Sequence, residues 1–117
     1  MRLILAYNAD AGVVAGLFDV AHKLLSPGTY PCDLCALTHG TWRMDPVWRL
    51  WLETRRYPVT VLHRDELRRE LPQVTAELPV VLVARTERVD VLLSAAEIAR
   101  IGAVDELIAA IEGRLAR

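Results

Sequence analysis

Apolar residues follow two spacings along this chain, and each spacing predicts one kind of element. Short apolar or β-branched runs bounded by turn-forming residues predict four buried strands, at residues 2–7, 57–62, 78–83 and 89–93. Arg85-Thr86-Glu87 separates the last two runs, a length that suits a β-hairpin. The first run ends at Asn8-Ala9-Asp10, which is typical of a turn after a strand.

Helical spacing of apolar residues predicts the remaining elements, at residues 13–25, 46–56, 64–71, 94–100 and 104–111. The second helix has the clearest start, because Asp45 is a good N-cap and Pro46 suits the first helical position. Arg55 and Arg56 favour its end, where cations stabilise the helix dipole. Residues 26–44 show no regular pattern. The order of the elements predicts an α/β fold with a central mixed sheet flanked by helices.

The length and charge of the chain narrow the function classes. A chain of 117 residues can bury one core, which predicts a single domain. The net charge is -1 and the basic residues are dispersed, so we expect no nucleic-acid partner. Asn8 and Asp10 interrupt the first apolar run, and no run approaches the roughly 20 residues of a membrane span. We therefore expect a cytoplasmic protein with no membrane partner.

Both cysteines lie in the irregular segment, as the Cys-X-X-Cys pair Cys32 and Cys35. In a reducing compartment such a pair is typical of catalysis, redox sensing or metal binding. Helical spacing would place both thiols on one face, and a helix N-terminus would lower the pKa of the first. Cys32 is then the attacking thiol and Cys35 the resolving one, and we expect the two to be able to form a disulfide. The Asp33 carboxylate opposes this effect, because it raises the pKa of a neighbouring thiol.

Two other interpretations of the cysteines remain open. Cys32, Cys35 and His39 have the spacing Cys-X2-Cys-X3-His, and zinc accepts sulfur and imidazole ligands. A fourth zinc ligand would come from a distant residue, with His63 as the candidate. Alternatively, both cysteines are small apolar residues without chemistry. The thiol interpretation requires no cofactor, whereas the metal interpretation requires zinc.

The segments "ELPVVLV" and "VDVLLS" and the final helix resemble the C-terminal half of thioredoxin-like proteins. The resemblance implies a single thioredoxin-like domain over residues 1–117 and thiol-disulfide exchange at Cys32 and Cys35. It also implies that Pro79 begins the strand facing the active site, with a cis peptide bond before it. Residues 27–31 would then occupy the strand that leads into the cysteines.

A second resemblance covers shorter motifs. "YNAD", "YPCDLCALT" and "LHRDEL" are similar to motifs in a small group of uncharacterised bacterial proteins, some of which carry the description GTPase. The chain contains no G-x-x-x-x-G-K-[ST] loop, which would supply the backbone amides and lysine that hold phosphates. We therefore expect no GTP binding through such a loop.

Polar residues follow two strands that we expect to be parallel. Asn8 and Asp10 follow the first and His63 follows the second, and ligand sites in α/β sheets gather outside the carboxyl ends of strands. Together with the cysteines and the loop before Pro79, these residues predict one composite binding surface. Each also has a simpler explanation, since Asp10 and Asp65 can be helix N-caps.

Trp48 and Trp51 share a face of the second helix, where they either pack in the core or form a ligand wall or dimer contact. The sequence as a whole predicts a small thiol-based oxidoreductase or redox sensor that exchanges with a protein or small-molecule thiol or disulfide. A zinc-binding module and a non-enzymatic interaction protein, including a homodimer, are the alternatives.

Overall fold

The computed structural model describes residues 1–8, 34, 37–38 and 45–116. Within these residues the strands are β1 (Arg2–Ala6), β2 (Val59–Leu62), β3 (Val80–Ala84) and β4 (Val89–Leu93). The helices are α3 (Pro46–Thr54), α4 (Arg64–Glu70), α5 (Ala95–Ala99) and α6 (Val104–Leu115). All four strands expected from the sequence are confirmed, whereas the helix expected at 13–25 lies outside the described residues. Among the described helices, none combines the length and apolar character needed to cross a membrane.

The strands form one mixed sheet in the order β2-β1-β3-β4. β1 runs parallel to β2 and antiparallel to β3, and β4 runs antiparallel to β3. Ala6 pairs with both Leu62 and Val80, so β1 and β2 end where β3 begins. We call this end of the sheet the carboxyl edge. The residues expected at 27–31 to lead into the cysteines lie outside the described residues, and β1 holds the central position beside β3.

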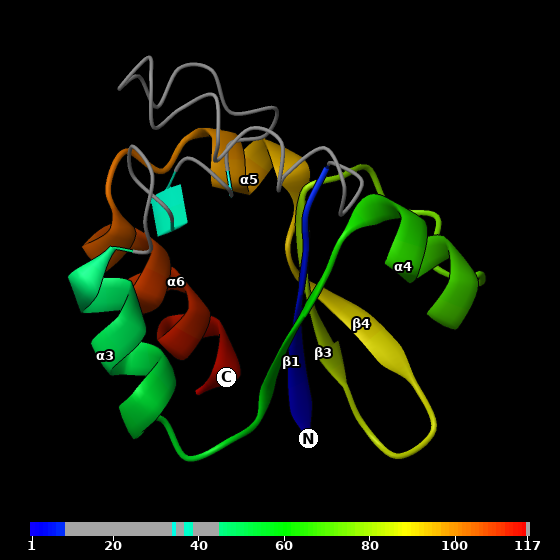
Figure 1. Ribbon diagram of the computed structural model, residues 1–117, viewed down its shortest axis with the longest axis horizontal. Helices are drawn as coiled ribbons and strands as arrows, with labels where there is room; N and C mark the ends of the chain where they lie inside the picture. Colours follow the sequence, from blue (N-terminus) through cyan, green and yellow to red (C-terminus); the bar gives the residue numbers. More distant parts are fainter. Residues whose placement is uncertain (9–33, 35–36, 39–44, 117) are drawn as a thin grey trace.

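Each face of the sheet carries its own apolar cluster, because successive strand residues point to opposite sides. Leu3 and Leu5 of β1 belong to the larger cluster, together with buried residues of α3, α5 and α6. Ile4 and Ala6 belong to the smaller cluster, which includes the buried residue of α4, Leu67. Figure 1 shows α3 and α6 on one side of the sheet and α4 on the other. The mixed α/β architecture expected from the sequence is confirmed.

Helix α3 begins as the sequence predicts. The Asp45 side chain accepts hydrogen bonds from the backbone N–H groups of Val47, at 2.8 Å, and Trp48, at 3.4 Å. These bonds satisfy two donors that the helix cannot pair internally. Trp48 and Trp51 are buried with ring centroids 4.9 Å apart, which confirms the core-packing interpretation of this pair. The Trp51 Nε1 also donates to Glu112 of α6 at 2.8 Å, which joins the two helices.

One arginine connects α6 to the rest of the C-terminal half. Ser94 caps α5, because its hydroxyl accepts from the Glu97 N–H while the Glu97 carboxylate accepts from the Ser94 N–H. Arg114 of α6 forms an ion pair with Glu97 and donates to the Leu92 carbonyl at 3.1 Å. The same carboxylate therefore serves both the cap of α5 and the docking of α6.

Candidate functional site

The carboxyl edge holds the described residues that the sequence nominates for a site. The Tyr7 N–H donates to the Leu62 carbonyl at 2.9 Å, so the contact between the two strands continues to Tyr7, the residue before Asn8. His63 follows β2 directly, and the buried Pro79 immediately precedes β3. The Leu78-Pro79 peptide bond is cis, as expected. Asn8, His63 and Pro79 thus share one edge, while Asp10, Cys32, Cys35 and His39 lie outside the described residues.

A buried hydrogen-bond chain joins Tyr7 to the segment that contains the cysteines. The Thr38 hydroxyl donates to the Leu34 carbonyl at 3.0 Å and lies 2.9 Å from the Tyr7 hydroxyl. Because Thr38 has a single hydroxyl proton, Tyr7 is the donor in the second bond. Leu34, Thr38 and Tyr7 are all buried. Leu34 and Thr38, which stand on either side of Cys35 in the sequence, are therefore fixed against the end of β1.

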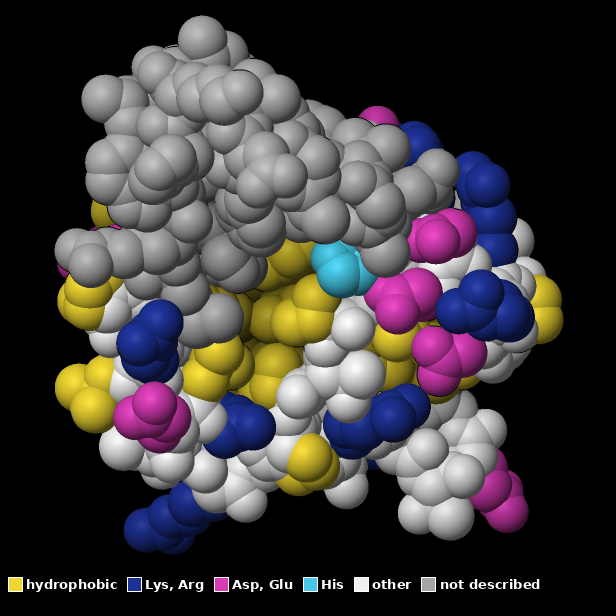
Figure 2. Space-filling model, viewed as in Figure 1, with side chains coloured by type: hydrophobic (Ala, Val, Ile, Leu, Met, Phe, Trp, Pro, Cys, Tyr) yellow, Lys and Arg dark blue, Asp and Glu magenta, His cyan; other side chains and the backbone are white. Residues whose placement is uncertain are grey.

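His63 is oriented by two neighbours. Its Nδ1 lies 2.5 Å from the Glu66 carboxylate, and its ring meets that of Tyr7 edge to face with centroids 5.7 Å apart. A carboxylate only accepts hydrogen bonds, so Nδ1 carries the proton and the basic lone pair of a neutral His63 falls on Nε2. The side chain is 22% exposed and reaches the surface, where it is the cyan group in Figure 2. His63 can thus accept one proton or one hydrogen bond from a molecule at this edge.

The helix α4 begins at Arg64, as the sequence predicts, but its N-cap differs from the expected one. Its N-cap is His63, and Asp65, expected as the cap, lies in the first turn. Sequence reasoning missed Glu66, which accepts the His63 backbone N–H at 2.8 Å in addition to the ring. The signal for it is the spacing of three residues from the end of a strand to a glutamate, half of a capping box. The bond from the His63 backbone N–H, followed by that from the His63 side chain, lowers the pKa of Glu66.

We expect Glu66→Gln to change how protein stability depends on pH. A lowered pKa means that the carboxylate stabilises the fold above its ordinary pKa of 4.5, and that this stabilisation is lost as the pH falls through the lowered pKa. At neutral pH the loss should be about 0.2–1 kcal/mol, the range for exposed ion pairs. Urea unfolding at a series of pH values should show that the free energies of unfolding of the two proteins converge at pH values below the lowered pKa of Glu66.

Glu70→Gln, at the exposed end of the same helix, is the matched control for Glu66→Gln. It should leave the free energy of unfolding unchanged to within about 0.5 kcal/mol. A difference between wild type and Glu66→Gln that stays constant from neutral to acidic pH would contradict the assignment.

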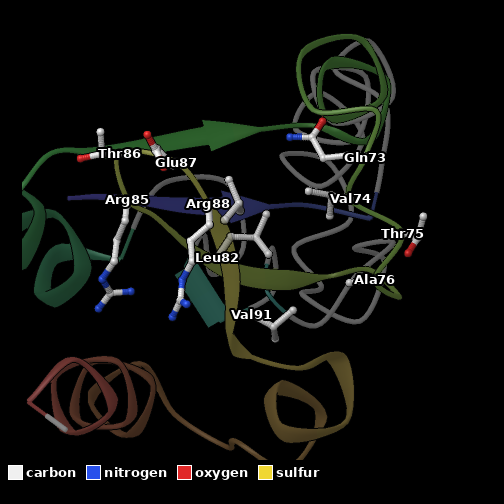
Figure 3. Close-up of a pocket in the computed structure, with 11 residues that line it drawn as sticks. Gln73, Val74, Thr75, Ala76, Leu82, Arg85, Thr86, Glu87, Arg88 and Val91 are labelled. Carbon is white, nitrogen blue, oxygen red and sulfur yellow. The ribbon is translucent and has the colours of Figure 1, made fainter.

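A hollow lies on the face of the sheet that carries the smaller cluster, between residues 73–76 and the β3–β4 hairpin (Figure 3). Leu82 lies on its lining, and Figure 3 shows Arg85 and Arg88 projecting to the same side of the hairpin. Asp90 lies 2.7 Å from the Arg88 Nε and 3.9 Å from Arg85, so it offsets part of their charge. This hollow brings together no histidine or cysteine among the described residues and does not belong to the site at the carboxyl edge.

The described residues by themselves form no candidate metal site. No group of three or more His, Cys, Asp or Glu side chains in the described part of the chain could hold a metal ion. The zinc alternative rests on Cys32, Cys35 and His39, which lie outside those residues.

No protein-family model, curated protein or solved structure matches the chain.

Proposed function

We propose that the protein is a small thiol-based oxidoreductase or redox sensor in which Cys32 attacks and Cys35 resolves. The observation that carries this proposal is the buried Tyr7–Thr38–Leu34 hydrogen-bond chain. It joins Leu34, which precedes Cys35, and Thr38, three residues after Cys35, to Tyr7 at the carboxyl edge, where α/β sheets gather their ligand sites. The proposed chemistry therefore belongs to the edge that also carries Asn8, His63 and Pro79.

A thioredoxin-like architecture is part of the proposal. The hairpin of β3 and β4 followed by α5 and α6 agrees with the resemblance of the C-terminal half. Pro79 is buried at the start of β3, and the next residue, Val80, pairs with Ala6 at the end of β1. The proline backbone thus adjoins the strand end from which Tyr7 reaches Thr38, as an active-site proline would.

The reaction that we propose is thiol-disulfide exchange. The Cys32 thiolate attacks one sulfur of a substrate disulfide, a mixed disulfide forms, and the other substrate sulfur leaves as a thiolate that takes up a proton. The Cys35 thiolate then attacks the Cys32 sulfur and releases the second substrate thiolate. The substrate gains two electrons and the protein is left with a Cys32–Cys35 disulfide, which a cellular dithiol reduces by the reverse steps.

The residues of the carboxyl edge supply binding in this scheme. We assign substrate contacts to Asn8, Asp10, His63 and the backbone at Pro79. His63 contributes a hydrogen-bond acceptor at Nε2, because Glu66 holds the proton on Nδ1. The partner is a protein or small-molecule disulfide.

Alkylation of the reduced protein across a pH series tests the proposal. We expect one thiol to react about tenfold faster at neutral pH than an unperturbed thiol, whose pKa is about 8.5, because the thiolate is the nucleophile. Cys32→Ser should abolish the fast reaction, and Cys35→Ser should retain it. If both thiols of the wild-type protein react no faster than free cysteine, the redox proposal is wrong.

The mass of the intact protein, purified without reductant or chelator, separates the redox proposal from its alternatives. A two-dalton loss that disappears on reduction supports a Cys32–Cys35 disulfide. Bound zinc, lost when Cys32 or Cys35 is replaced by serine, would support the metal-binding module instead. If the intact protein shows neither a two-dalton loss nor bound zinc, and its thiols react no faster than free cysteine, a non-enzymatic interaction protein is the remaining interpretation.

A further inference from the structure

A hollow of about 500 Å³ lies at the end of the sheet opposite the carboxyl edge. The end of α3 and the residues after it contribute Thr54, Arg55, Arg56 and Tyr57 to its lining, and α6 contributes Glu112 and Leu115. The Leu3 N–H donates to the Pro58 carbonyl at 3.0 Å where β2 begins, which places Tyr57 at this far end. The hollow is therefore separate from the proposed site of thiol chemistry.

Two hydrogen-bond donors beside this hollow have no acceptor among the residues that the structure describes. In the described part of the chain, three buried side-chain polar atoms lack a hydrogen-bond partner, and two of them belong to lining residues: the Arg55 Nε and the Tyr57 hydroxyl. Buried polar groups are normally paired, because an unpaired one loses its hydration without compensation. The nearby Glu112 carboxylate already accepts from the Trp51 Nε1.

The charges of the lining favour an anion. Arg55 and Arg56 contribute two positive charges, and Glu112 contributes one negative charge. Burial, followed by the charge of Glu112, raises the pKa of Tyr57, so its hydroxyl keeps its proton at neutral pH and remains a donor. Leu115 and Ala116 add apolar wall to the hollow. The combination offers donors and positive charge at one place and apolar surface beside it.

We propose that this hollow binds a small monocarboxylate with an apolar body. The carboxylate would accept hydrogen bonds from Arg55 and Tyr57, and the apolar body would pack against Leu115. The Arg55 Nε and the Tyr57 hydroxyl have almost no exposed surface, so a side chain at the rim has to rotate before the ligand reaches them. Arg56, which also lines the hollow, is exposed.

Titration with 3-phenylpropionate, compared with its neutral amide, tests the assignment. The NMR signal of the Trp51 indole N–H is the reporter, because this group bonds Glu112 and its ring lies 6.3 Å from that of Tyr57. We expect saturable shifts with a Kd of about 1 mM or lower for the carboxylate, and binding about tenfold weaker for the amide. Tyr57→Phe and Arg55→Gln should each weaken carboxylate binding by about tenfold, since each removes a hydrogen bond to a charged group.

Arg49→Gln is the matched control, because Arg49 is an exposed arginine of α3 that does not line the hollow. It should leave the affinity unchanged, and circular dichroism should confirm that all three variants are folded. Absence of saturation at about 10 mM carboxylate would overturn the assignment. So would equal affinity for the amide, or unchanged affinity in folded Tyr57→Phe and Arg55→Gln. Neither cysteine takes part, so failure of the proposed thiol chemistry would leave this result unaffected.

Discussion

Replacing Trp48 with alanine is expected to lower the free energy of unfolding by about 3–5 kcal/mol, the range for removing a large aromatic side chain from a core. Trp48 is fully buried, and its ring packs against Trp51 at a centroid distance of 4.9 Å. Trp48 and Trp51 are the two buried residues of α3, so the substitution removes one of the two side chains that hold this helix in the core. Urea unfolding followed by circular dichroism measures the loss.

Two further variants make this prediction specific. Leu50→Ala, at a position of the same helix that is 61% exposed, should change stability by less than about 0.5 kcal/mol. Trp48→Phe should cost less than Trp48→Ala, because it keeps an aromatic ring and removes a buried indole N–H that has no partner in the described part of the chain. A loss below about 1 kcal/mol for Trp48→Ala would show that α3 does not anchor the larger cluster.

Leu67→Ala is expected to lower the free energy of unfolding by about 2–5 kcal/mol, and to loosen the carboxyl edge as well. Leu67 is 4% exposed and is the buried residue of α4, which packs on the smaller cluster. The helix carries Glu66, which orients His63, so its docking on the sheet also sets the geometry of the histidine. Chemical unfolding measures the first effect, and the NMR signals of the His63 ring measure the second.

Arg69→Ala, at an exposed position of α4, is the control for Leu67→Ala and should leave both readouts unchanged. Unchanged His63 signals in a destabilised Leu67→Ala protein would mean that the Glu66 contact is set by the local turn and not by the docking of α4. A destabilisation below about 1 kcal/mol would contradict the role of Leu67 in the smaller cluster.

The two ends of the sheet carry different groups of side chains. The carboxyl edge carries Tyr7, His63 and the anchored residues Leu34 and Thr38. The opposite end carries Arg55 and Tyr57 beside an apolar hollow. A carboxylate bound at the far end would therefore contact none of His63, Leu34 and Thr38, and we expect it not to compete with the proposed thiol chemistry.

Local signals in the sequence were sufficient to predict most of the described elements. Asp45 and Pro46 start α3 because a side-chain acceptor and a fixed φ angle act within one turn, independently of the rest of the chain. The apolar runs predict all four strands for a similar reason, since alternation and β-branching act between near neighbours. Ser94 caps α5, as predicted from the preference of serine for the N-cap position. The resemblance to thioredoxin-like proteins predicted the cis bond at Pro79, which the structure confirms.

Tertiary structure alone decided how these elements combine and which side chains meet. The contact of Tyr7 with Thr38 joins residues 31 positions apart, and that of Trp51 with Glu112 joins residues 61 positions apart. The partners of β1 in β2 and β3 are also distant in the sequence, and local patterns carry no information over such separations. The role of Glu66 at His63 depends on where β2 ends. The Arg55 and Tyr57 donors, which lack acceptors among the described residues, depend on how α3 meets α6. Hydrogen-bond partners are chosen by packing, because a buried polar group can pair only with the groups that the fold brings within reach.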